Sequence, residues 1–69
     1  MKYSILFGGP GTMSTTDPVL FKTWVGIAEG IQALQKTDDE ATTTYRLGDS
    51  SLPEDVRNDW NKIAGLLTT

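Results

Sequence analysis

The absence of both cysteine and histidine from a chain of 69 residues constrains its fold more than any other feature of the sequence. Disulfides and zinc sites are the usual supplements to a small hydrophobic core, and neither forms without these side chains. A domain of this length buries only about 60% of the surface that its unfolded chain exposes. The sequence therefore predicts one small domain, residues 1–69, for which a partner chain is the remaining source of added stability.

Charge and hydropathy exclude two classes of partner. Six basic and nine acidic residues give a net charge of −3, and the acidic excess lies in residues 38–69. Binding nucleic acid through its phosphates needs a clustered basic surface, which no segment supplies. No apolar run approaches the roughly 20 residues of a membrane span, and Ile5–Phe7 is too short for a signal peptide. We expect a cytoplasmic protein that binds neither nucleic acid nor membrane.

Two segments show the alternation that is typical of β-strands. In residues 2–7, the side chains of Tyr3, Ile5 and Phe7 share one side, and a run of glycine and proline follows. Residues 41–47, "ATTTYRL", alternate in the same way and are rich in β-branched threonine. We predict a strand in each segment.

Two further segments show helical spacing. Asp17 is a suitable N-cap and Pro18 a suitable first residue, so a helix is predicted from residue 18 to about residue 36. Its apolar residues recur at steps of three and four: Leu20, Trp24, Ile27, Ile31 and Leu34. A capping-box pattern at residues 51–54 predicts a second helix that runs nearly to the C-terminus. Its apolar stripe includes Trp60, and we expect both tryptophans in the core.

These elements predict an α+β (small α/β) fold with the order strand, helix, strand, helix. The long helix between the strands permits a parallel, right-handed crossover. Because two strands make a marginal sheet, pairing across a dimer into four strands would be economical. The alternative is a mostly helical fold with short extended ends.

Residues 8–15 partly match the phosphate loop of nucleotide-hydrolysing enzymes, G-x-x-x-x-G-K-[ST]. Met13 replaces the second glycine, and Ser14 replaces the lysine that meets the phosphate charge. We therefore predict a tight turn without useful binding of ATP or GTP. The alternative is weak anion binding by free amides at a helix N-terminus, through Gly8, Gly9, Gly11 and Thr12.

Catalysis is not expected from this chain. Hydroxyl side chains are numerous, but no histidine is present to activate them. Asp55 and Asp59 share a face of the predicted second helix, where they complement the helix dipole or pair with Lys62. We predict no catalytic residue, no metal ligand and no cofactor.

The predicted first helix carries a second strip of small, smooth side chains beside its apolar stripe. The two interior glycines, Gly26 and Gly30, each destabilise a helix by about 1 kcal/mol relative to alanine. Close approach of another backbone, which larger side chains would block, is the usual interaction that offsets this cost. That backbone belongs either to the protein's own sheet or to a partner chain. The strip is the predicted partner-binding site, in a homodimer or with another protein: Val19, Thr23, Gly26, Gly30 and Ala33.

The sequence therefore predicts a small non-catalytic protein-binding module, such as an accessory protein or a stoichiometric inhibitor of a larger target. Phages and mobile elements encode many chains of this kind. The alternatives are a structural subunit of a larger assembly and a weak anion binder that uses the Gly8–Thr15 loop.

Overall fold

Four strands and two helices follow one another in the order strand, strand, helix, strand, strand, helix. The computed structural model describes every residue from 1 to 69. The predicted α+β class is confirmed, but the predicted order is wrong because two further segments form strands. The elements are β1 (Lys2–Phe7), β2 (Thr12–Thr15), α1 (Pro18–Ile27), β3 (Ile31–Thr37), β4 (Thr42–Tyr45) and α2 (Trp60–Leu67).

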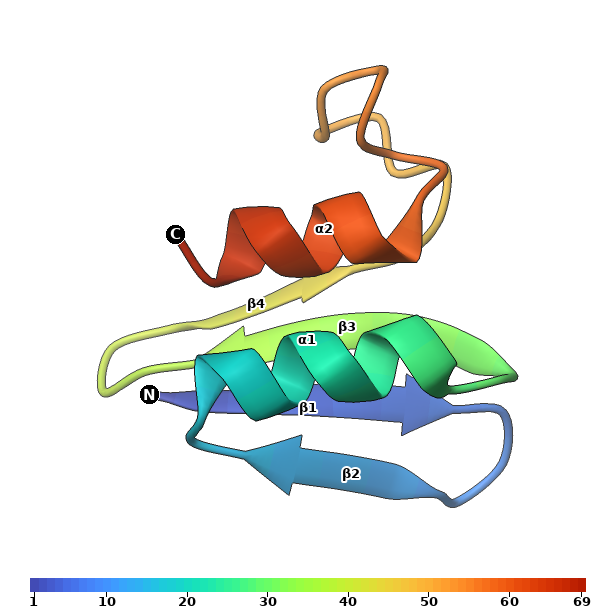
Figure 1. Ribbon diagram of the computed structural model, residues 1–69. Coiled ribbons are helices and arrows are strands. Elements are labelled where there is room, and N and C mark those ends of the chain that lie inside the picture. The colour runs from blue at the N-terminus through green and yellow to red at the C-terminus, as the bar shows by residue number, and fades with distance from the viewer.

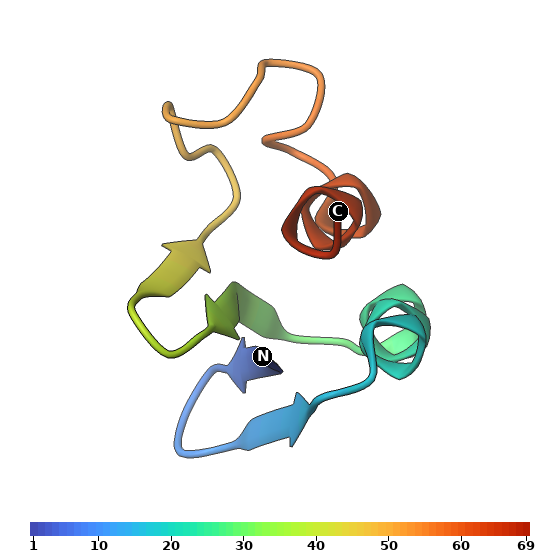
Figure 2. The same ribbon diagram turned by 90° about the vertical axis from the view of Figure 1, so that its left-hand side faces the viewer.

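The sheet is antiparallel throughout and has the strand order β2-β1-β3-β4. Two hairpins, β1–β2 and β3–β4, join where β1 pairs with β3, so β2 and β4 form the edges (Figure 1). Both helices lie on one face of the sheet (Figure 2). The chain therefore contains no parallel crossover, and it reaches four strands without a second copy.

The first helix ends at Ile27, well before the predicted end near residue 36. Gly30 has a φ of +76°, a left-handed conformation that suits glycine, and the chain turns there into β3. The pairing of β1 with β3 shifts register between Leu6 and Phe7, so that β3 contains one extra residue. This β-bulge lets Ile31 and Leu34, three residues apart, both pack on the core side. Their spacing therefore imitates that of a helix.

The segment after the glycine turn is also a strand, not a helix entry. Phe7 N–H donates to Gly11 O (3.1 Å), and β2 then pairs with β1 from Thr12 onward. Gly9 has a φ of +93° in this hairpin turn. The predicted turn is therefore present, but it joins two strands.

The second helix begins at Trp60, later than its capping-box pattern predicts. Asp59 is the N-cap, and its carboxylate accepts from Asn61 N–H (2.9 Å). The earlier pattern forms only one turn, in which Val56 and Arg57 N–H donate to Pro53 O (2.9 and 3.1 Å). Asp59 lies inside the predicted helix, but its backbone is extended, as an N-cap requires. The helix therefore cannot run continuously from residue 51 through Asp59.

The core lies between the helices and one face of the sheet. Tyr3 and Phe21 stack at its centre, with their ring centroids 5.2 Å apart. Trp24 and Trp60 pack against this core but are only partly buried. The prediction that both lie in the core is therefore right only in that both contact it. The core residues are Tyr3, Ile5, Phe21, Val25, Leu34, Leu52, Ile63, Ala64 and Leu67.

Candidate protein-binding surface

Helix α1 presents apolar side chains to solvent as well as to the core. Its buried residues, Phe21 and Val25, belong to the core. At about 100° per residue, this orientation turns the other apolar flank outward. Val19 is 66% exposed and Ile27 is 76% exposed. The predicted core stripe through Leu20 and Ile27 is therefore wrong, because Phe21 and Val25 form the inner stripe.

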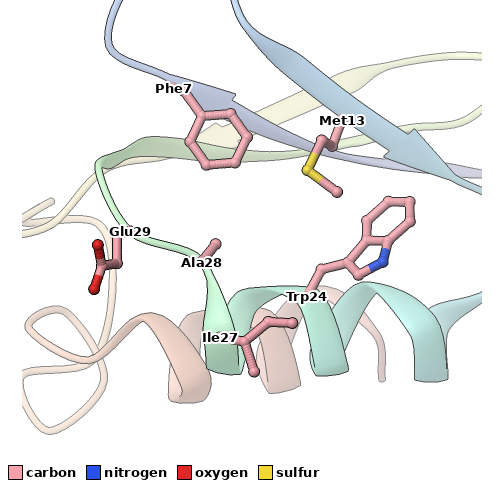
Figure 3. A pocket seen from close by; sticks show the side chains of 6 residues that line it. All are labelled: Phe7, Met13, Trp24, Ile27, Ala28 and Glu29. Atoms are coloured by element: carbon pink, nitrogen blue, oxygen red, sulfur yellow. The ribbon is translucent and has the colours of Figure 1, made fainter.

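A hollow of about 330 Å³ lies beside this exposed flank, between α1 and the β1–β2 hairpin. In Figure 3, Phe7 and Met13 extend from the strands toward Trp24, which extends from the helix. Ile27 stands on the helix at the margin of the same hollow. Five of the six lining residues are hydrophobic, and the set is Phe7, Met13, Trp24, Ile27, Ala28 and Glu29.

Glu29 is the charged member of this lining, and it is exposed just beyond the end of α1. A carboxylate beside an apolar hollow favours a cation close to the group that fills the hollow. We refer to the hollow and the outer flank of the helix together as the α1 surface, comprising Phe7, Met13, Val19, Leu20, Trp24, Ile27, Ala28 and Glu29.

The predicted strip of small residues is not one strip in the structure. Val19, Thr23 and Gly26 lie on α1 and are exposed, whereas Gly30 lies in the turn beyond the helix. Ala33 is only 1% exposed and lies on β3. The assignment to a single helix face fails because the helix ends before the last two residues.

Gly26 faces the second helix of the same chain. A Cβ at this position would lie 3.6 Å from Asn61 Oδ1, an ordinary van der Waals distance. The neighbour of Gly26 is therefore a side chain of the same protein, and no backbone approaches it closely. The Thr23 hydroxyl is also used internally, since it donates to Val19 O (3.0 Å).

The glycine loop lacks the geometry on which anion binding was predicted. Gly8, Gly9 and Gly11 lie in the hairpin turn, and Thr12 begins β2, so no helix follows the loop. Gly8 N–H donates to Gly30 O (3.4 Å). At the N-terminus of α1, the Asp17 carboxylate accepts from the N–H groups of Val19 and Leu20 (2.9 and 3.3 Å).

The two aspartates that were predicted to share a helix face, Asp55 and Asp59, lie in different local structures. Asp55 precedes α2 and Asp59 caps it, so their predicted common helix face does not exist. Lys62 Nζ donates to the Asp55 backbone oxygen (3.3 Å). No three acidic side chains gather as a metal site would require.

Two aspartates are held in their ionised form by hydrogen bonds within turns. Backbone N–H groups of Glu40 and Ala41 donate to Asp38 and lower the pKa of its carboxyl below the ordinary 3.8. The Ser51 hydroxyl, followed by the Ser51 N–H, lowers the pKa of Asp49 in the same direction. Asp38 is exposed and Asp49 is half-buried, and neither lines the hollow.

The α1 surface was only partly visible in the sequence. Val19 belonged to the predicted partner-binding strip, but Phe7, Met13, Ile27 and Glu29 did not. The available signal was the surplus of apolar residues on the predicted helix. This signal cannot locate the hollow, because the sequence predicts a loop where the structure has β2, the strand that supplies Met13.

No protein-family model, curated protein or solved structure matches this chain. No helix of the structure is both long and apolar enough to cross a bilayer.

Proposed function

We propose that this protein is a small, non-catalytic module that binds a larger protein through the α1 surface, as an accessory protein or stoichiometric inhibitor. The observation that carries the proposal is the 76% exposure of Ile27, which stands at the margin of an apolar hollow. Exposed apolar side chains grouped around a concavity are typical of protein-binding sites. Trp24 adds an aromatic anchor of the kind that often dominates binding energy.

The lining of the hollow defines the chemistry of the partner. Phe7, Met13 and Trp24 favour an apolar side chain that fills the hollow. Glu29 favours a lysine or arginine next to that side chain. The proposed target therefore presents an apolar residue adjacent to a basic one on an accessible segment.

Capture of partners from cells of the native source, followed by mass spectrometry, identifies candidate targets, and calorimetry with a purified target tests the surface. We expect Ile27→Lys to weaken binding by at least about tenfold, because it places a charge in an apolar contact. Glu29→Lys should weaken binding to a basic segment, because it removes the attracting carboxylate. The affinity that remains should fall less on addition of salt than the affinity of the wild type.

Lys22→Ala is the matched control, because Lys22 is an exposed residue of the same helix outside the α1 surface. Circular dichroism must show that each variant is folded. A target that binds the Ile27→Lys variant as tightly as the wild type would exclude the α1 surface as the binding site.

A further inference from the structure

The outer edge of β4 carries backbone groups without partners. Asp38 N–H donates to Ala41 O (3.0 Å), which closes the β3–β4 hairpin. Hydrogen-bonded pairs alternate along an antiparallel ladder, so Lys36–Thr43 and Leu34–Tyr45 are the next bonded pairs. The N–H and C=O groups of Thr42 and Thr44 therefore point away from β3. No backbone hydrogen bond from a turn or loop reaches either residue.

The sequence of β4 leaves this edge open to another strand. Its four residues, "TTTY", are strand formers and include no proline and no charge. Proteins usually protect an exposed edge with charged side chains, proline or a bulge. Figure 2 shows β4 at one margin of the sheet, from which the loop 46–59 leads away toward the side of the helices.

Charges of opposite sign flank this uncharged strand. The acidic turn Asp38, Asp39 and Glu40 precedes it, and Arg46 follows it directly. When such a segment pairs with an identical antiparallel copy, the acidic end of each copy meets the basic end of the other. The charges on either side of β4 therefore attract those of an identical strand that pairs antiparallel with it.

We infer that β4 pairs antiparallel with β4 of a second copy of this chain. With the two-fold axis at Thr43, Thr42 of each copy lies opposite Thr44 of the other, and their outward N–H and C=O groups form the hydrogen bonds of the ladder. The same register brings the turn that contains Glu40 in each copy toward Arg46 of the other copy. Two four-stranded sheets then become one sheet, in a closed two-fold dimer.

The other edge, β2, does not provide this match. Residues 8–16 contain no charged side chain, so nothing fixes the register of a second strand. Pairing of β4 with β2 of another copy would also be open-ended and would produce polymers. The dimer through β4 is separate from the α1 surface, so its failure would leave the proposed target binding intact.

The first test places proline at the edge. Because the Thr44 N–H points outward, Thr44→Pro keeps the backbone hydrogen bonds between β3 and β4, although it removes the bond that Gln35 Nε2 donates to Thr44 Oγ1 (3.0 Å). It also removes one hydrogen bond from each copy of the dimer. Four-residue strands bury a small interface, so the dimer should depend on concentration. Thr44→Pro should raise its dissociation constant by at least about tenfold. Thr12→Pro is the matched control at the outward position of the other edge, and it should dimerise like the wild type.

Sedimentation equilibrium distinguishes the outcomes. The wild type should approach twice its 7.5 kDa mass as concentration rises, and Thr44→Pro should remain near 7.5 kDa. A wild type that stays monomeric up to about 1 mM, where even weak dimers form, overturns the inference. Polymers, or a dimer broken only by Thr12→Pro, overturn it as well.

The second test exchanges the charges. Glu40→Lys and Arg46→Glu should each weaken the dimer about three- to tenfold, because like charges then face each other twice. The double variant Glu40→Lys/Arg46→Glu restores opposite charges and should recover wild-type association. Circular dichroism checks that all three variants are folded. Equal loss in the single and double variants would exclude this register.

Discussion

Phe21 and Trp24 lie one helical turn apart on α1, yet they should contribute very differently to stability. Phe21 is fully buried and stacks on Tyr3, whereas Trp24 is partly buried beside the hollow. We expect Phe21→Ala to lower the free energy of unfolding by about 3–5 kcal/mol, close to the whole stability of so small a domain. Trp24→Ala should cost less. Urea unfolding measures both, with exposed Val19→Ala as the control, and a larger loss for Trp24→Ala would show that the core is centred elsewhere.

At the same scale, Asp38 should make stability depend on acid pH. Hydrogen bonds from Glu40 and Ala41 lower the folded-state pKa of Asp38 below its ordinary 3.8. The stabilisation is therefore present above the ordinary pKa and is lost as the pH falls through the lower, folded-state value. Asp38→Asn should flatten the decline of melting temperature below about pH 4. Asp39→Asn, which alters an exposed carboxylate in the same turn, should not.

At the scale of elements, Gly30 and Gly65 should respond to alanine in opposite directions. Gly30 has a φ of +76°, so Gly30→Ala should destabilise the protein by about 1–2 kcal/mol. Gly65 lies within α2 with open space where a Cβ would stand, so Gly65→Ala should stabilise it by up to about 1 kcal/mol. Thermal unfolding measures both changes. Destabilisation by Gly65→Ala would indicate a neighbour that contacts this position.

The elements that were predictable from sequence are those with a local signal. Alternation located β1 at its observed bounds and located β4 within residues 41–47, and Asp17 with Pro18 marked the start of α1. Ile31 and Leu34 were misassigned because the bulge in β3 gives a strand the spacing of a helix. The hollow could not be predicted, because it forms between α1 and the β1–β2 hairpin. Residues 12–15 become strand β2 through pairing with β1, and the sequence of these residues alone does not indicate a strand.

At the scale of the whole molecule, one core joins elements from both ends of the chain. Ile63, Ala64 and Leu67 of α2 are buried together with residues of β1, α1 and β3. Removal of residues 60–69 should therefore abolish cooperative unfolding, rather than produce a shorter folded protein. Removal of Thr69 alone, which is exposed, is the control. A dispersed amide spectrum from the 1–59 fragment would show that the sheet and α1 fold without α2.

The strand order has a consequence for how strongly the molecule could hold a target. Strand β4 lies at the opposite margin of the sheet from β2, whose Met13 lines the hollow beside α1. Two copies joined at β4 would keep their α1 surfaces at the two far ends of the sheet, both free for binding. Such a pair would be bivalent, and on a repetitive or paired target its avidity would exceed the affinity of either end without a single new contact.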